Sequence, residues 1–204
     1  VETNNIIANG DFAHYADKPY GWTEGGTGTA TDSGATGRYA FTSDTAATLT
    51  QTGLTGLNAG PGLNGAGQLT LDIGWVNSNS SSRTFDIQVG GVTYAALTTG
   101  TNVTNGSITY LNGATNAAGA TTATAITAIG SGTGTLTSIT INLPSSVAAS
   151  GSLVFSGANA GDDIYIDNVK LRTNITSMVD QTAGSNWNAT YTENGPAVAI
   201  SDTD

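Results

Sequence analysis

The stretch "GQLTLDIGWVN" at residues 67–77 shows the pattern that decides the fold. Apolar side chains occupy every second position, at Leu69, Leu71, Ile73 and Trp75, and polar or small residues stand between them. Successive side chains of a β-strand point to opposite faces, so this alternation predicts a half-buried strand. Trp75 shares the apolar face, which favours a place in the core over a role in ligand binding.

The same alternation recurs along most of the chain, and no segment has convincing helical periodicity. We expect about ten short strands separated by turns, and therefore an all-β fold, an antiparallel β-sandwich of the jelly-roll type. Residues 113–132 are low in sequence complexity and predict either a long loop or a weak turn of helix. The clearest strand segments lie within residues 4–12, 37–54, 67–77, 84–99, 106–113, 135–144, 150–161 and 162–172.

The alternation stops after Arg172, and this change predicts a domain boundary. We expect one jelly roll over residues 1–173, and a linker with the start of a second, incomplete β module over 174–204. The first residues, "VETNNIIANG", have no basic start and no long apolar run of the kind seen in a secretion signal. We therefore expect the chain to be a processed or excised piece of a multidomain protein.

The composition limits the classes of partner. The chain has 204 residues, with 15 acidic and 5 basic residues and a formal net charge of -10. Nucleic acids and anionic membrane surfaces select basic patches, so neither is an expected partner. No stretch approaches the ~20 apolar residues needed to span a membrane. The chain has no Cys and many Thr, Gly and Asn residues, a composition that favours a secreted or cell-surface bacterial protein but also permits a cytosolic one.

The stretch "AGDDIYIDNVKLR" at residues 160–172 carries Asp162, Asp163 and Asp167 among apolar residues that a strand would bury. Carboxylates at a buried strand are costly unless a positive group meets them, and the chain has few Lys and Arg residues. We therefore expect a metal ion as their partner. The alternative is an ordinary Gly-Asp turn, with Asp167 facing solvent.

Several short motifs carry a resemblance to a known family. They are "NNIIANGDF" near the start, "YGW" at 20–22, "GRYAF" at 37–41, the central strands and the closing "DDIYIDNVKL". Together they resemble the calcium-binding jelly-roll carbohydrate-binding modules of families four, nine and twenty-two, over residues 4–172. The tail "YTENGPAVAISDTD" resembles the first strand of the cadherin-like or immunoglobulin-like repeats of large bacterial adhesins.

The resemblance implies a structural Ca2+ ion that ties the N-terminal turn to the last strand. It places the side chain of Asp167, an oxygen of Asp11 and the backbone carbonyl of Arg38 on that ion. Ala13 stands where the family usually has Glu and offers only its carbonyl, for which Asp11 or Asp163 would compensate. Calcium takes six to eight oxygen ligands, drawn from carboxylates and carbonyls.

The resemblance also implies a polysaccharide or glycan as partner, which such folds hold on aromatic side chains. The expected stacking residues are Tyr20, Trp22, Tyr15 and Tyr39, although Trp22 matches a family position that is usually structural. Asp72 and Asp86 alternate with apolar neighbours and would accept hydrogen bonds from sugar hydroxyls. We expect these two carboxylates to face each other on adjacent strands.

Catalysis finds little support in the sequence. The single His14 has no partner in a recognisable triad, and adjacent Asp162 and Asp163 would point to opposite faces of a strand. The sequence therefore predicts a non-catalytic carbohydrate-binding module of a secreted or cell-surface protein with further domains. The alternative is a structural spacer or adhesin domain with the same fold and no affinity for sugar.

Overall fold

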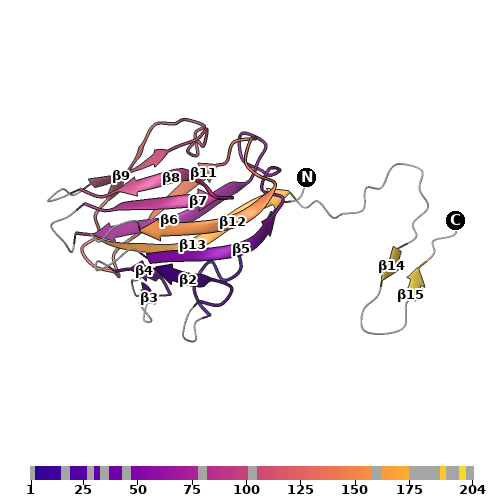
Figure 1. The fold of residues 1–204 in the computed structure, drawn as a ribbon, viewed down its shortest axis with the longest axis horizontal. Coiled ribbons are helices and arrows are strands. Elements are labelled where there is room, and N and C mark those ends of the chain that lie inside the picture. Colours follow the sequence, from indigo (N-terminus) through magenta and orange to yellow (C-terminus); the bar gives the residue numbers. More distant parts are fainter. Residues whose placement is uncertain are drawn as a thin grey trace.

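The computed structural model describes residues 4–14, 19–26, 37–42, 47–77, 82–100, 105–157 and 162–174, and the backbone alone of residue 3 and of 30–32, 189–191 and 198–200. Within these ranges the regular structure consists of strands alone, arranged as two packed antiparallel sheets and one two-stranded pair in the tail (Figure 1). The prediction of an all-β sandwich is thus confirmed. None of the described residues belongs to a helix long and apolar enough to cross a membrane.

The first sheet has six strands, in the order β11 (Thr137–Asn142), β6 (Gln68–Val76), β13 (Asp163–Asn174), β4 (Tyr39–Phe41) and β3 (Ala30–Asp32), with β1 (Thr3–Asn5) also paired to β13. The second has seven strands, in the order β10 (Thr124–Thr127), β9 (Asn105–Tyr110), β8 (Val92–Thr98), β7 (Thr84–Val89), β12 (Ser150–Gly157), β5 (Ala47–Thr55) and β2 (Thr23–Gly26).

The strand order is that of a jelly roll. Strands β4, β13, β6 and β11 form one half, and β5, β12, β7 and β8 form the other. From β4 onward the chain therefore changes sheet at every connection between β4 and β7, and again at every connection between β10 and β13. Consequently β6 and β7, which follow each other in the sequence, lie in different sheets.

Alternating apolar residues of both sheets meet in one core. Leu69, Leu71, Ile73 and Trp75 of β6 are all buried, as their spacing predicts. Six aromatic rings form a continuous chain through the core, with centroids 4.8 to 6.1 Å apart. They are Phe12, Trp22, Tyr39, Phe41, Phe85 and Phe155.

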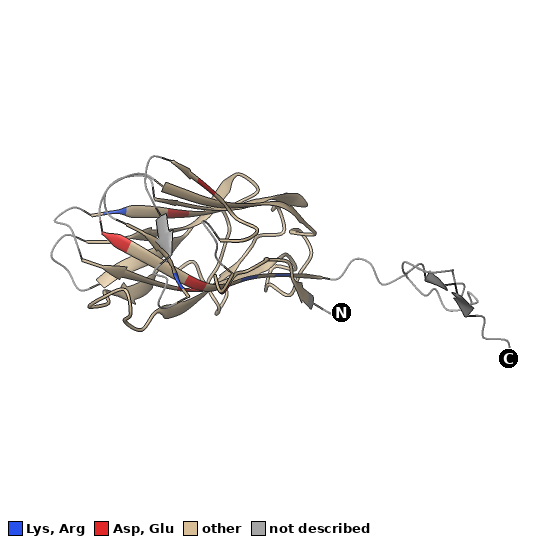
Figure 2. Ribbon diagram, turned by 90° about the horizontal axis from the view of Figure 1, so that it is seen from below, with Lys and Arg blue, Asp and Glu red and all other residues tan. Residues whose placement is uncertain are grey.

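Charged side chains are thinly scattered over the described ribbon (Figure 2). The core therefore depends on apolar burial, with Arg83 and Asp162 as its buried charged residues among those described.

Strand β13 contains a bulge where its pairing with β6 shifts between Asp167 and Lys170. Asn168 has a φ of 50° there, in the left-handed region that Asn tolerates better than most residues. Ile164 and Ile166 are buried before the bulge. Because of the extra residue, Val169 and Leu171 after it are buried as well.

The structure also departs from the predicted elements. Strands β2, β3 and β10 were not expected, and residues 113–132 contain β10 and irregular segments in place of a helical turn. In the tail, β14 (Ala189–Tyr191) pairs with β15 (Val198–Ile200). The predicted boundary at 173 lies at the end of β13, but no described contact tests the division into two domains.

Candidate functional site

The outer face of the seven-stranded sheet carries a row of small and polar side chains across its strands. The registers of the strand pairs place in one line, from β2 to β9, the residues Gly25, Thr48, Ser156, Asp86, Ala96 and Thr109. We call this line the Asp86 row. The parallel line beside it consists of Thr23, Thr50, Val154, Gln88 and Thr93.

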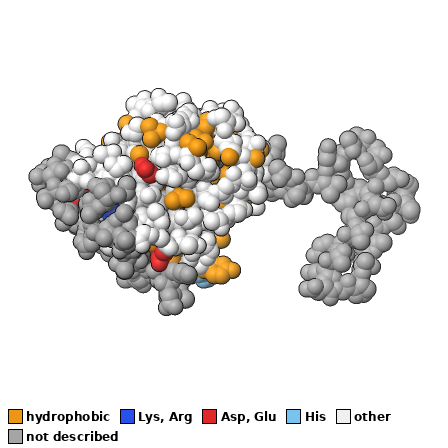
Figure 3. Space-filling view, in the orientation of Figure 1, with side chains coloured by type: hydrophobic (Ala, Val, Ile, Leu, Met, Phe, Trp, Pro, Cys, Tyr) orange, Lys and Arg blue, Asp and Glu red, His pale blue; other side chains and the backbone are white. Residues whose placement is uncertain are grey.

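Asp86 is the single charged residue of these two lines. It is half-buried between Ser156 and Ala96, and this burial raises the pKa of its carboxyl group. Its carboxylate makes no hydrogen bond or ion pair with any residue in the described ranges. Figure 3 shows a broad face of the sandwich on which few charged side chains are visible and the hydrophobic ones are scattered.

The outer face of the six-stranded sheet is occupied differently, because residues 128–136 lie across it. The side chains of Ile129 and Leu136 fill the space above Gly74 of β6, and Gly132 lies against the ring of Tyr165. Arg38 fixes this segment by donating from Nη1 to the carbonyl oxygens of Gly132 and Gly134, each at 2.7 Å. The protein's own chain thus covers the middle of this face.

Asp72 and Asp86 lie on these two different sheets, which corrects the expectation that they face each other. Asp72 is on β6, where it accepts hydrogen bonds from Ser138 and, at 2.8 Å, from the side-chain amide of Asn168. The sandwich core separates it from Asp86 on β7, so the two carboxylates cannot contact one small ligand together.

Two of the four aromatic residues expected to stack on sugar are core residues. Tyr39 is fully buried and donates from its hydroxyl group to Glu24 at 2.8 Å. Trp22 is 4% exposed, and its indole Nε1 donates to the carbonyl oxygens of Ala8 and Asn9. Neither ring offers a face to a ligand, which corrects the expectation for both.

Tyr20 is 75% exposed and is the one expected stacking residue described as accessible. Tyr15 lies outside the described residues. Three other aromatic side chains that the sequence offers are buried, namely Trp75, Tyr94 and Tyr110. Any sugar site on the described sheet faces must therefore depend mainly on polar contacts.

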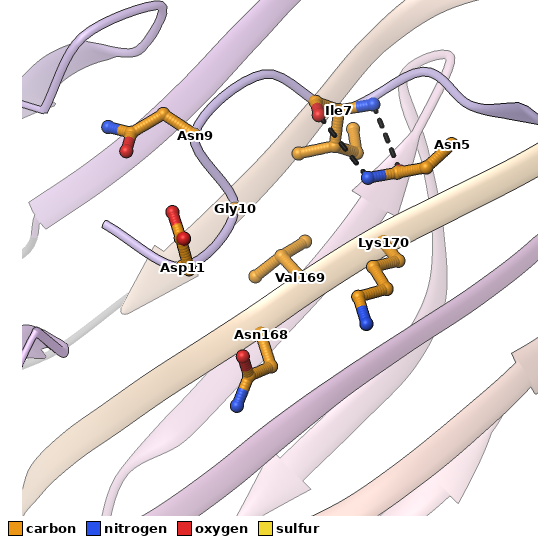
Figure 4. Close-up of a pocket in the computed structure, with 8 residues that line it drawn as sticks. All are labelled: Asn5, Ile7, Asn9, Gly10, Asp11, Asn168, Val169 and Lys170. Atoms are coloured by element: carbon orange, nitrogen blue, oxygen red, sulfur yellow. Dashed lines mark hydrogen bonds between the residues drawn. The ribbon is translucent and has the colours of Figure 1, made fainter. Parts of the chain in front are cut away.

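The N-terminal turn crosses the bulge of β13. Gly10 lies directly over Val169, and its carbonyl accepts a hydrogen bond from the Val169 amide at 2.8 Å. A Cβ at Gly10 would overlap the Val169 carbonyl oxygen, so this crossing requires glycine. Asp11 and Asn168 are among the residues that line a hollow of about 340 Å³ beside this crossing. Figure 4 shows the residues that line it.

The expected metal ligands partly converge beside this turn. Burial raises the pKa of Asp167, the charges of Asp72 and Asp11 raise it further, and the amide of Asn168 and the charge of Arg38 oppose the increase. The backbone carbonyl of Asp11 lies near Gly37, directly before Arg38. Segments from three parts of the chain therefore meet here.

These donors fit a calcium ion only in part. Across the described ranges, no three acidic or histidine side chains converge closely enough to hold a metal ion, so backbone carbonyls would have to supply much of the coordination. Ala13 is exposed, and its amide donates to Asp11 Oδ1 at 3.4 Å. Asp163 is four residues from Asp167 along β13, about 13 Å at the rise of a strand, so the two cannot share one ion.

Asp162 and Asp163 instead have a cationic partner within the protein. Arg83 is fully buried, and its Nη1 donates to the carbonyl oxygens of Phe41, Thr42 and Asp162. Burial lowers the pKa of Arg83, and the charges of Asp163 and Asp162 oppose this effect. Arg83 therefore supplies a positive charge near the first two aspartates of "DDIYIDN" from within the protein itself.

His14 lies in the N-terminal turn and is exposed. Its backbone amide and carbonyl bond to the side chain of Asn9, at 3.0 and 2.9 Å. His14 thus belongs to a local turn, as expected for a loop residue.

No protein-family model matches this chain, and none of the curated proteins compared with it matches its sequence. The class that the fold defines is an antiparallel β-sandwich.

The sequence did not reveal the role of Arg83 or the difference between Asp86 and the other carboxylates. Arg83 follows the polar sequence "SNSSS", and nothing in its neighbours indicates burial. Asp86 has the same alternating context as Asp72, and only the sheet assignment separates them. The spacing of Ile164, Ile166, Val169 and Leu171 did contain a signal for the bulge, because one step is three residues.

Proposed function

We propose that this protein is a non-catalytic carbohydrate-binding module of a secreted or cell-surface bacterial protein, and that its glycan lies along the Asp86 row. One observation carries this proposal: an unpartnered carboxylate stands among small, hydroxyl-bearing side chains on an otherwise neutral sheet face. A carboxylate accepts hydrogen bonds from several hydroxyl groups at once, and neighbouring Thr and Ser side chains both donate and accept. Such a surface matches the hydroxyl groups of a polysaccharide.

The placement of the carboxylates supports a binding role over hydrolysis. Glycoside hydrolysis requires two carboxyl groups that flank one bond, about 5 to 10 Å apart. Asp86 and Asp72 lie on opposite sheets, and Asp162 and Asp163 interact with buried Arg83. None of these pairs presents two free carboxyl groups to one sugar linkage.

A second candidate function is a spacer or adhesin domain without affinity for sugar. The burial of Trp22 and Tyr39 favours it, because an aromatic platform is a common means of holding a pyranose ring. In this alternative the polar sheet face serves only solubility.

A structural calcium ion belongs to the same proposal. Asp167 and Asp11 would supply carboxylate oxygens, and the carbonyls of Ala13 and Arg38 would complete the set. The ion would offset the repulsion among Asp167, Asp11 and Asp72, and would fix the N-terminal turn against β13.

The proposal is tested by retention of the purified protein on a panel of insoluble polysaccharides in the presence of calcium. We expect the wild type to be retained on at least one polymer and Asp86→Asn to lose this retention while it melts at the wild-type temperature. A wild-type protein that no polymer retains would favour the spacer function. Retention unchanged in Asp86→Asn would show that the glycan binds elsewhere.

A further inference from the structure

Asp86 differs from the other described acidic side chains because it has no partner. Glu24 accepts a hydrogen bond from Tyr39, Asp11 from the Ala13 amide, Asp72 from Ser138 and Asn168, and Asp167 from the Asn168 amide. Asp162 and Asp163 interact with Arg83. The carboxylate of Asp86 is thus the one described negative charge left without a donor or a cation.

The position of Asp86 leaves its carboxylate partly removed from water. The side chain is half-buried between Ser156 and Ala96, its two small neighbours on β12 and β8. A partly desolvated carboxylate gains most from a charged donor, because a hydrogen bond between two ions is about twice as strong as one between neutral groups. A small ammonium group is the best complement to this position.

The surroundings of Asp86 favour a cationic partner over a neutral or anionic one. The residues of the Asp86 row and of the line beside it include no Lys or Arg that could hold an acidic sugar, and no aromatic ring on which a neutral sugar could stack. The chain carries a formal net charge of -10, which attracts polycations over distance.

We propose that the Asp86 row recognises a polysaccharide of unacetylated amino sugars, with one protonated amine on the Asp86 carboxylate and sugar hydroxyls on the flanking Thr48 and Ser156. This inference rests on the proposed carbohydrate-binding function and specifies its ligand class. The neutral side chains on either side contact uncharged parts of the sugar chain, so one ammonium group per site is sufficient.

The test compares retention on chitosan, chitin and cellulose beads, in mildly acidic buffer at physiological ionic strength. Chitosan presents free amines, chitin carries the same backbone with acetylated amines, and cellulose has hydroxyl groups in their place. We expect the wild type to be retained on chitosan about tenfold more strongly than on the other two, the difference that one charged hydrogen bond provides.

Two variants with the same change in net charge separate a specific site from general attraction. Asp86→Asn should lose the preference for chitosan, and Asp72→Asn, on the opposite sheet, should keep it. Melting curves of both variants establish that the sandwich is folded. Soluble glucosamine oligosaccharides should compete for the site better than a lysine peptide of equal charge.

The outcomes distinguish this inference from the function on which it rests. Equal retention on chitosan and on a neutral polymer, with loss in Asp86→Asn, would overturn the cationic ligand and leave carbohydrate binding intact. Equal loss in both variants, or equal competition by the lysine peptide, would also overturn it, because charge alone would then explain retention. Absence of retention on all three beads would overturn the cationic ligand, and absence of retention on the whole polysaccharide panel would contradict both.

Discussion

The Nη1 of Arg83 donates a hydrogen bond of 3.0 Å to the carbonyl oxygen of Asp162, and both residues are fully buried. The same nitrogen donates to the carbonyls of Phe41 and Thr42. The guanidinium of Arg83, which directly precedes β7, therefore links β7 to the end of β4 and to the start of β13. The paired aspartates that the sequence assigns to a metal thus belong to a structural ion cluster.

Replacement of Arg83 by Ala should therefore destabilise the protein strongly. The change leaves buried carbonyls and two carboxylates without their cation, and the free energy of unfolding should fall by about 3–5 kcal/mol. Urea denaturation measures this loss. The control is Arg172→Ala on the exposed side of β13, which should cost less than about 0.5 kcal/mol. Equal losses in the two variants would contradict the role of Arg83.

The crossing of the N-terminal turn over β13 gives a second prediction. Gly10→Ala places a methyl group on the Val169 carbonyl, which backbone atoms cannot easily vacate, and should cost about 2–3 kcal/mol. Gly130→Ala is the matched control, because a Cβ there meets nothing within 4 Å. Thermal melting of both variants decides the matter, and an unchanged melting temperature in Gly10→Ala would show that the turn can move away from β13.

Two aromatic residues close together in the sequence should behave in opposite ways. Trp22→Ala opens a cavity among Phe12 and Phe155 and should lower the free energy of unfolding by about 3–5 kcal/mol. Tyr20→Ala removes a ring that is 75% exposed and should cost less than about 0.5 kcal/mol. Chemical denaturation of the pair checks this contrast. Similar losses for the two would mean that burial has been assigned incorrectly.

The fold was predictable because its main signal is local. Alternation at Leu69, Leu71, Ile73 and Trp75, repeated in β7 and β12, specifies which face of each strand is buried, and many such strands require two packed sheets. The short strands β2, β3 and β10 were not predictable in the same way. They have only three or four residues, and their pairing partners supply the support, as Thr50 does for Thr23 in β2.

The candidate site was less predictable, because it depends on which sheet receives each strand. Asp72 and Asp86 have the same local pattern, yet one accepts bonds from Asn168 and Ser138 and the other has no described partner. Burial of Arg83 and Tyr39 likewise follows from long-range packing. Local sequence patterns carry no information on either.

Asp167 gives a prediction that depends on pH and calcium. Its pKa is raised in the folded protein, mainly by burial, so its favourable contribution to stability is complete below the ordinary pKa of about 3.9 and is lost as the pH rises through the raised value. In chelator, the wild type should therefore lose stability relative to Asp167→Asn between acidic and neutral buffer.

Calcium should reverse this order at neutral pH if it binds Asp167. A ligand at a hundred times its dissociation constant stabilises the folded state by about 2.7 kcal/mol, and Asp167→Asn should gain much less than the wild type. Melting curves in calcium and in chelator provide the measurement. Wild-type curves that coincide in the two buffers would exclude a calcium ion that stabilises this fold.

The most direct test of the Asp86 site is an NMR titration of the wild-type protein with soluble glucosamine oligosaccharides, with the acetylated oligosaccharides titrated in parallel. We predict that the backbone amide signals that shift belong to β7, β12 and β8, around Asp86, Ser156 and Ala96, and that the glucosamine series shifts them at lower concentration. Shifts concentrated on β6 and β13 around Asp72, or the absence of shifts in both series, would contradict the account.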